Sequence, residues 1–273
     1  MDISKIHQSI KLIHKLNIPE NPYYLGFSGG KDSLVLYDLA VKSGVLFFPE
    51  YSNTTIDPPG TIQFIKQHYP LVKIINPKYS FYKLVERKGL PTRLSRFCCY
   101  YLKENAGKGH RTLLGIRMDE SFQRSLYEPE QCDTRRGRKN TVSIRPILNW
   151  SESDIWEYIK YYNLPYLKFY DQPYSFKRHG CVGCPMAGAH VQIREYKIFP
   201  RYVYALLKAI KKNMILKPNN TFARSFKDEY EVFDWWLSGQ SIKQYLLDRK
   251  FLLFPSDLRN NIENLFPKNN NSE

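Results

Sequence analysis

The stretch LGFSGGKDSLVL (residues 25–36) decides the fold of this chain. A short apolar run ends at Phe27, a polar turn covers residues 28–33, and apolar residues return from Leu34. Adjacent glycines allow a turn with positive φ and a close approach to a ligand. A helix that begins after such a turn presents unpaired N–H groups and a partial positive charge. The stretch therefore predicts strand, tight turn and helix, with a phosphate chain bound at the turn. It is not the G-x-x-x-x-G-K-[ST] loop, because Lys31 directly follows the second glycine.

Further apolar, β-branched or aromatic runs predict four more strands after the one at 23–27. They lie at 45–48, 72–75, 112–116 and 142–147, with helix-like stretches at 33–42 and 60–68 between the early ones. Strands that alternate with helices indicate an α/β fold with a parallel sheet. Ligands of such sheets bind at the carboxyl ends of the strands, which is where the turn at Ser28 is expected.

The rest of the chain is predicted to be largely helical. Isoleucines at helical spacing between Ile3 and Leu16 predict an amphipathic helix, and a second helix is expected to begin at a cap of Ser151 or Ser153. Residues 1–190 are expected to form the nucleotide-binding domain, residues 191–266 a helical C-terminal segment, and residues 267–273 a disordered tail. In the helical segment, Trp235 and Trp236 are expected to pack in a core or an interface.

Charge is the strongest compositional signal. The 273 residues include 41 lysines and arginines and 26 aspartates and glutamates, a formal net charge of +15. This predicts an anionic partner, although a solvated lysine-rich surface is the other interpretation. The run TRRGRKN concentrates this charge and is expected to bind nucleic acid, the alternative being a solvated loop that touches nothing. Its basic residues are Arg135, Arg136, Arg138 and Lys139.

No apolar run approaches the roughly 18 residues that cross a membrane. The first 22 residues are polar and amphipathic and lack the core of a signal peptide. A cytoplasmic location without a membrane partner is therefore expected. In that compartment, cysteines are reduced, bound to metal or catalytic rather than joined in disulfides.

Four of the five cysteines form two close pairs. Cys98 and Cys99 are adjacent, and Cys181 and Cys184 lie in HGCVGCPMAG. Four thiolates suffice for one [4Fe–4S] cluster or one zinc ion, whereas a C-x-x-C alone could be a redox pair. Glycines at 180 and 183 favour a tight loop whose N–H groups point at sulfur. Cys132 stands alone and is interpreted as an incidental thiol.

Together, these segments resemble a known family. SGGKDS resembles the PP-loop of the ATP pyrophosphatases, and the chain from about Tyr23 to Gly188 resembles the phosphoadenosine phosphosulfate (PAPS) reductase family. The supporting segments, in the family's order, are NTTIDPPGTIQFI, RFCCYYLKE, GIRMDESFQR, RPILNWSESDIWEYIKYYNLPY and GCVGCP. The resemblance implies a three-layer, parallel-sheet fold like that of the adenine nucleotide alpha-hydrolases. It also favours a [4Fe–4S] cluster over zinc, with Cys98, Cys99, Cys181 and Cys184 as ligands.

The resemblance also assigns nucleotide-binding residues. The ATP phosphates would be cradled by Ser28, Gly29, Gly30, Lys31, Asp32 and Ser33. Asn53 and Asp57 would lie near the adenosine, while Gly115, Arg117 and Arg124 would line the phosphate or substrate side. Catalysis is assigned to Lys31, Asp32 and Arg117. Two alternatives remain open: Asp57 could simply begin the turn with Pro58 and Pro59, and Arg117 could form a surface ion pair with Asp119 or Glu120.

Two departures from the sulfonucleotide reductases of this family decide the expected activity. No cysteine follows Cys184, so the thiol that would attack sulfate sulfur is missing. The loop also keeps the full pattern expected for ATP. The resemblance therefore implies an ATP pyrophosphatase that uses ATP and Mg²⁺ to adenylate an oxygen and helps replace it with sulfur.

Within the family, the chain most resembles the ATP pyrophosphatase subunits of DNA phosphorothioation systems, which work with a cysteine desulfurase. DNA is thus favoured over tRNA as the partner, and a homodimer is left open. The alternatives are a tRNA-thiolating enzyme, a reductase of adenosine phosphosulfate or its 3′-phosphorylated form, and a non-enzymatic iron–sulfur module that binds nucleic acid. Sequence does not separate a cluster that relays sulfur from one that fixes the substrate loop.

Overall fold

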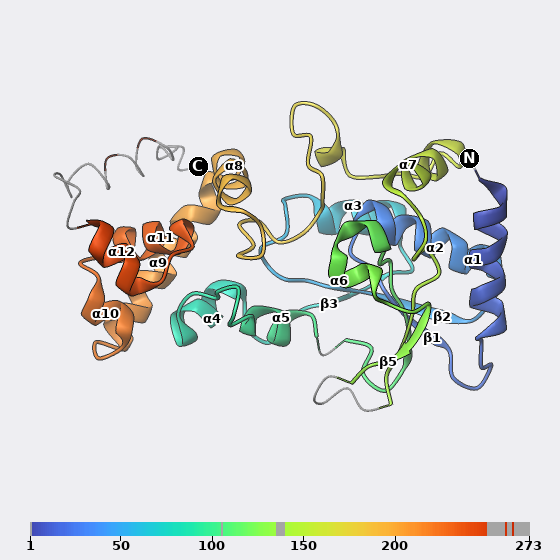
Figure 1. The fold of residues 1–273 in the computed structure, drawn as a ribbon, viewed down its shortest axis with the longest axis horizontal. Coiled ribbons are helices and arrows are strands. Elements are labelled where there is room, and N and C mark those ends of the chain that lie inside the picture. The colour runs from blue at the N-terminus through green and yellow to red at the C-terminus, as the bar shows by residue number, and fades with distance from the viewer. Residues whose placement is uncertain (1, 105, 135–139, 250–259, 261–263, 265–273) are drawn as a thin grey trace. The chain divides into compact units, whose positions relative to one another are not determined.

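The computed structural model describes residues 2–104, 106–134, 140–249, 260 and 264 (Figure 1). The chain forms two compact units. The sheet unit contains Met1–Asn53, Pro59–Asn76 and Lys103–Gly180, and the helical unit contains Thr54–Pro58, Pro77–Leu102 and Cys181–Glu273. The expected boundary at residue 190 differs from this division, because two internal segments join the C-terminal helices.

The sheet unit has six strands in the order β3-β2-β1-β4-β6-β5. All neighbouring pairs are parallel except β5 with β6, so the predicted α/β class with a mostly parallel sheet is confirmed. The strands are β1 (Tyr23–Gly26), β2 (Phe47–Ser52), β3 (Lys73–Ile75), β4 (Arg111–Leu113), β5 (Glu130–Cys132) and β6 (Val142–Ile144). The strand β1, which leads into the glycine turn, lies between β2 and β4, and this places the turn at the middle of the sheet.

One predicted strand is longer in the structure than expected, and another strand was not predicted. The second strand was expected at 45–48, where the apolar run stops at Pro49, yet β2 continues to Ser52. The backbone polar groups of Glu50 point toward β1, since the Glu50 carbonyl accepts from the Phe27 N–H. Those of Pro49 therefore point away from β1, toward β3. Pairing with β3 begins only at Glu50, and Pro49 therefore costs no ladder hydrogen bond. The exposed edge strand β5 was not predicted at all, because it has no apolar alternation.

Helices of the sheet unit surround this frame. They are α1 (Ile3–Lys15), α2 (Lys31–Ser43), α3 (Thr61–His68), α6 (Phe122–Ser125) and α7 (Glu152–Tyr161), with short 3₁₀ turns η1 (Met118–Glu120) and η2 (Lys168–Tyr170). α2 packs against both α1 and α7. Its apolar side is completely buried at Leu34, Leu36 and Leu39, which anchors the helix that follows the glycine turn.

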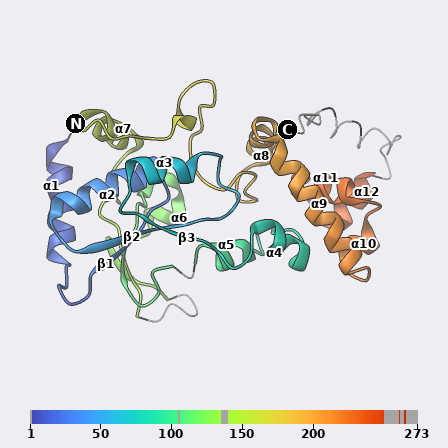
Figure 2. The same cartoon turned by 180° about the vertical axis from the view of Figure 1, so that it is seen from behind.

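The helical unit has its own core. Its helices are α4 (Phe81–Lys88), α5 (Phe97–Leu102), α8 (Ala189–Ile198), α9 (Pro200–Leu216), α10 (Thr221–Ser225), α11 (Glu229–Ser238) and α12 (Ile242–Arg249). α4 packs along α9 (Figure 2), which explains why residues 77–102 belong with the C-terminal helices. Trp235 and Trp236 are buried in this core, as predicted, and the Trp236 indole N–H donates to the Pro91 carbonyl. No helix in the described part of the chain is long and apolar enough to cross a membrane.

Candidate functional site

The turn between β1 and α2 is held closed by its own serines. The Ser28 N–H donates to Ser33 Oγ at 3.2 Å, and Ser33 Oγ donates to the Gly30 carbonyl at 2.8 Å. The Gly30 N–H donates to Ser28 Oγ at 3.2 Å. Gly29 has a φ of +76°, a conformation that favours glycine. The predicted strand, turn and helix are therefore present, and the turn is a preformed loop at the N-terminus of α2.

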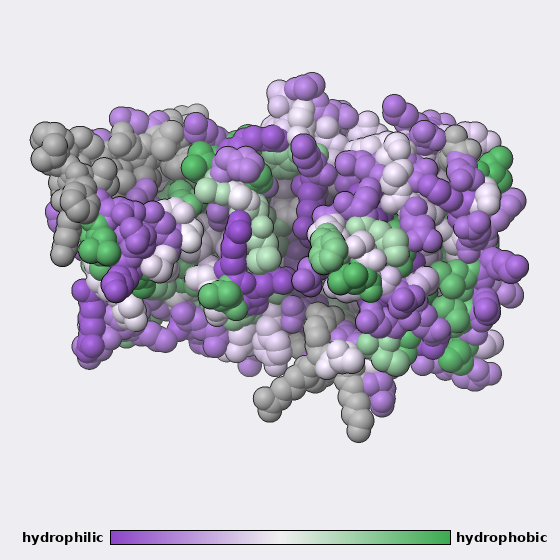
Figure 3. All heavy atoms as spheres, in the orientation of Figure 1, coloured by the Kyte–Doolittle hydropathy of each residue, from purple (hydrophilic) through white to green (hydrophobic). Residues whose placement is uncertain are grey.

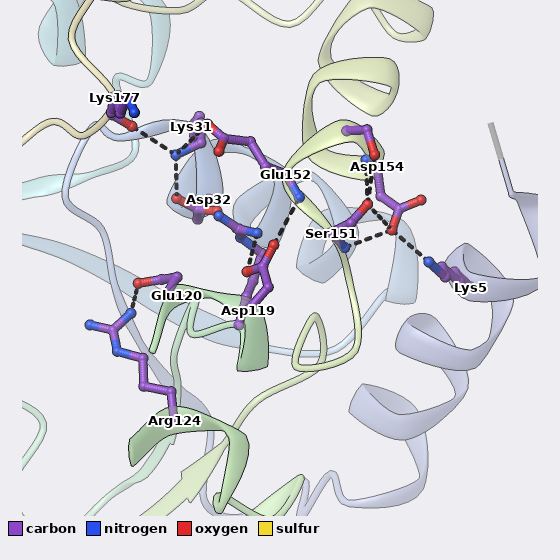
Figure 4. Close-up of polar contacts among 12 residues, drawn as sticks. Lys5, Lys31, Asp32, Asp119, Glu120, Arg124, Ser151, Glu152, Asp154 and Lys177 are labelled. Atoms are coloured by element: carbon purple, nitrogen blue, oxygen red, sulfur yellow. Dashed lines mark hydrogen bonds and ion pairs between the residues drawn. The ribbon is translucent and has the colours of Figure 1, made fainter. Parts of the chain in front are cut away.

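Lys31, the first residue of α2, is buried to 4% exposure beside this loop. Its ammonium donates to the Lys177 carbonyl at 3.2 Å and lies 3.5 Å from the Asp32 carboxylate and 3.7 Å from that of Glu152 (Figure 4). Its backbone N–H donates to the Tyr170 hydroxyl at 3.0 Å. Burial raises the pKa of Tyr170, so this hydroxyl stays protonated.

Arg117 completes a charged group next to the loop. Its Nε donates to Asp32 at 2.6 Å, and its Nη1 donates to Asp119 at 2.5 Å. Burial by itself would lower the pKa of Arg117, but the charges of Asp32 and Asp119 outweigh it and raise the pKa. The alternative of an ion pair with Asp119 is thus half right, because the pair forms but Arg117 is only 3% exposed and also holds Asp32. Glu120 pairs instead with Arg124 (Figure 4).

Gly115 brings the chain after β4 against the first turn of α2. A Cβ at this position would lie 3.1 Å from the Asp32 carbonyl oxygen, so only glycine allows the approach without a shift. Arg124 lies on α6, where burial lowers its pKa and the charge of Arg178 lowers it further. Lys31, Asp32, Gly115 and Arg117 are therefore adjacent, as a site at the carboxyl ends of β1 and β4 requires. Their binding of nucleotide stays a prediction.

Asn53 and Asp57 fall in different units. The Asn53 amide donates to Asn76 at 2.9 Å, which links the ends of β2 and β3 in the sheet unit. Asp57 belongs to the helical unit, where its carboxylate accepts from the Thr54 N–H at 3.3 Å and its carbonyl accepts from the Tyr202 hydroxyl at 2.7 Å. These contacts involve neither Pro58 nor Pro59, so the turn interpretation of Asp57 and an adenosine contact for both residues stay predictions.

The four paired cysteines all lie in the helical unit and are half-buried, whereas Cys132 is exposed on β5 of the sheet unit. A hydrogen bond with Cys99, burial and the nearby Cys181 raise the pKa of the Cys98 thiol. Among the described residues, no three His, Cys, Asp or Glu side chains are arranged to hold a metal ion. The chemistry of this donor set, four thiols within one compact unit, nevertheless fits a Cys₄ cluster.

At Gly183, the structure differs from the expectation that N–H groups of the cysteine loop point at sulfur. Gly183 does adopt a positive φ, +67°, but its N–H does not point at a sulfur. It donates to the Glu195 carboxylate on α8 at 2.7 Å. Sequence reasoning missed this contact, as it missed Tyr170 and Glu152 near the phosphate loop, because no local pattern marks these residues.

The basic residues Arg135, Arg136, Arg138 and Lys139 lie outside the described residues. Their flanks are described: the Asp133 N–H donates to the Thr141 carbonyl at 2.8 Å, directly after the last pair of the antiparallel strands β5 and β6, Cys132 with Val142. In the sequence, the run lies between the described strands β5 and β6, and its contact with nucleic acid stays a prediction.

Comparison with known proteins identifies the family. Residues 22–187 match the phosphoadenosine phosphosulfate reductase domain. The chain belongs to this family. The matched region of the PAPS reductase family includes the phosphate loop, Gly115, Arg117 and all four paired cysteines, so it draws on both compact units.

The chain is also similar to individual proteins and to a solved structure. An adenosine 5′-phosphosulfate reductase of Oceanobacillus iheyensis is 30% identical over 169 residues, which is 58% of this chain and 68% of that protein. An uncharacterized protein of Methanocaldococcus jannaschii is 33% identical over 185 residues, 64% of this chain. The chain spans less than half of that relative, 44% of its length. A crystal structure of PAPS reductase from Candida auris, in a phosphate complex, is 18% identical with a TM-score of 0.48, over 64% of this chain and 88% of that one.

Proposed function

We propose that this protein is an ATP pyrophosphatase that adenylates an acceptor oxygen and supports the replacement of that oxygen by sulfur. The observation that carries the proposal is the convergence of Lys31, Asp32 and Arg117 on the closed loop at the N-terminus of α2. A helix N-terminus with two buried cations beside it favours a chain of phosphates. The pattern of the loop supports ATP as the ligand.

The proposed reaction is a transfer at the α-phosphate of ATP. The acceptor oxygen attacks the α-phosphorus, the bond between the α-phosphorus and the α,β-bridging oxygen breaks, and pyrophosphate leaves with that oxygen and the electron pair. Lys31 and Arg117 would neutralise the charge that develops on the phosphate oxygens, which is the main source of catalysis in such transfers. Asp32 would help to hold Mg²⁺, which binds through one or two carboxylates together with substrate phosphates. The AMP group then leaves with the acceptor oxygen when a sulfur nucleophile replaces it.

The nature of the products tests this assignment. We expect AMP and pyrophosphate from ATP and Mg²⁺, and Lys31→Ala should remove most of the turnover because one of the two buried cations is lost. Lys177→Ala is the matched control, since Lys31 contacts only the backbone carbonyl of that exposed residue. Product chromatography that shows ADP as the main product would refute the proposal.

A [4Fe–4S] cluster held by the four paired cysteines is the second part of the proposal. When bound, such a cluster would hold or relay the sulfur, or fix the substrate loop. Protein prepared without oxygen should contain about four iron and four sulfide per chain. Serine at Cys98, Cys99, Cys181 or Cys184 should bleach it, while the exposed Cys132→Ser should keep its colour. Stoichiometric zinc without iron would contradict this part.

The acceptor is proposed to be a nucleic acid, with the DNA backbone favoured over tRNA and a cysteine desulfurase as sulfur donor. The net charge of +15 supports a polyanionic partner. Hydrophilic side chains cover much of the face seen in Figure 3, as expected for a surface that meets water or a phosphate backbone.

Reduction of a sulfonucleotide is the second candidate, because the O. iheyensis relative is an adenosine 5′-phosphosulfate reductase. With adenosine phosphosulfate and a thiol reductant, we expect no sulfite above background, since residues 185–273 contain no cysteine that could attack the sulfate sulfur. Sulfite release that depends on a cysteine of this chain would favour the reductase instead.

A further inference from the structure

The loop that carries Cys181 and Cys184 is held by hydrogen bonds and packing against one face of α8. Glu195 accepts from the Gly183 N–H at 2.7 Å, and the Gln192 side-chain amide donates to the Gly183 carbonyl at 3.1 Å. The backbone N–H and carbonyl of Gly183, one of the two residues between the cysteines, are thus both bonded to side chains of one helix. The Tyr196 ring of the same helix closes the third side, since a Cβ on Gly183 would lie 1.9 Å from its hydroxyl oxygen.

We infer that Glu195 and Gln192 are positioning residues for the C-x-x-C half of the cysteine site. They hold the Gly183 peptide in one orientation, and this fixes the directions in which Cys181 and Cys184 leave the backbone. The inference rests on the proposed cluster, because positioned thiols matter only if they share a ligand.

Because these hydrogen bonds lie in buried surroundings, breaking them is energetically costly. Gln192 and Tyr196 are buried, at 4% and 2% exposure. Burial raises the pKa of Glu195, although the hydrogen bond from Gly183 opposes the shift. Loss of Glu195 would leave the buried Gly183 N–H without an acceptor, and loss of Gln192 would leave its carbonyl without a donor. Leaving a buried polar group unpaired costs more free energy than the hydrogen bond contributes to stability. The positive φ of Gly183 would then be free to relax.

These hydrogen bonds also account for the direction of the Gly183 N–H. In many cluster loops, backbone N–H groups donate to sulfur and tune the cluster. Here Glu195 takes that N–H, so the helix rather than the ligand orders the loop. The Gly183 peptide is therefore ordered before any cluster binds, as is usual for groups that orient metal ligands from behind.

Three variants and a control test the inference in the full chain. Glu195→Leu and Gln192→Leu each remove one hydrogen bond, Glu195→Gln keeps an acceptor of similar shape, and Lys197→Leu changes an exposed charge on the same helix. After anaerobic reconstitution with iron and sulfide, a chelator should remove iron on the order of 10-fold faster from the two Leu variants at positions 195 and 192. Glu195→Gln and Lys197→Leu should behave like the wild type. Rescue by Gln distinguishes positioning from general loss of packing.

A measurement on the protein without cluster separates this inference from the proposed cofactor. Exchange of the Gly183 amide hydrogen should be on the order of 10-fold faster in Glu195→Leu than in Glu195→Gln. Wild-type protein that binds no iron would refute the cluster, while the exchange rates would still decide whether Glu195 holds the Gly183 amide. Leu variants that load iron, lose it at the wild-type rate and leave the Gly183 amide equally protected would overturn the inference.

Discussion

The absence of a side chain at Gly115 allows the chain after β4 to pack against the first turn of α2. The Gly115 Cα faces the first turn of α2, and a methyl group there would lie 3.1 Å from the Asp32 carbonyl oxygen and 3.2 Å from its carbonyl carbon. Because both atoms are backbone, Gly115→Ala must displace α2 or the end of β4. We expect a loss of about 1–3 kcal/mol in the free energy of unfolding and weaker pyrophosphate release, measured by denaturant titration and product assay. Gly26→Ala, where the new methyl would make only ordinary contacts at 3.7 Å, should be nearly neutral in both. Equal effects of the two substitutions would contradict this account.

The N-terminal cap of α7 stabilises the fold to an extent that depends on pH. Ser151 caps the helix in a capping box with Asp154, and Lys5 of α1 donates to the same carboxylate at 2.5 Å. Burial by itself would raise the pKa of Asp154, but the hydrogen bonds from Lys5 and Ser151 outweigh it and lower the pKa below its ordinary 3.8. The stabilisation is therefore present above pH 3.8 and is lost as the pH falls through the lowered value. Asp154→Ala should cost about 1 kcal/mol at neutral pH and progressively less in acid, as thermal or denaturant unfolding across pH would reveal. A cost that does not change with pH would show that the ionised carboxylate contributes nothing.

The charge of the entire chain is proposed to guide a phosphate backbone, with the basic run TRRGRKN as the main contact. If roughly six phosphates are neutralised, the affinity for DNA should fall by on the order of 10³ between about 50 and 200 mM salt. Alanine at Arg135, Arg136, Arg138 and Lys139 should flatten this salt dependence and weaken binding about equally for all sequences, as expected for backbone contacts. ATP turnover without DNA should survive.

A control of equal charge separates a specific contact from net charge. Alanine at four exposed lysines of the sheet unit removes the same charge, and these are Lys11, Lys15, Lys66 and Lys160. This control should keep most of the wild-type affinity and slope in a fluorescence anisotropy titration. If the variant with alanine at the four basic residues 135, 136, 138 and 139 also keeps the wild-type affinity and salt slope, tRNA or a small molecule becomes the favoured sulfur acceptor.

The amino-acid sequence by itself determined the features that depend on near neighbours. Strand, turn and helix at Ser28, the cap at Ser151 and the burial of Trp235 were all predictable, because backbone torsion, capping and apolar spacing are set within a few residues. The family was likewise recognisable from short motifs in a fixed order. The identity of the four paired cysteines as candidate ligands also needed only their spacing.

Only the tertiary structure decided which distant residues meet. Arg117 reaches Asp32 across 85 positions, and the Tyr170 hydroxyl meets the Lys31 N–H across 139, because strand order and loop closure bring them together. For the same reason, residues 77–102 joined the C-terminal helices, and the Gly183 N–H turned to Glu195 rather than to sulfur. A local pattern fixes what a side chain can do, whereas its partner is chosen by packing over the entire chain, since a buried polar group must find a partner wherever the fold places one.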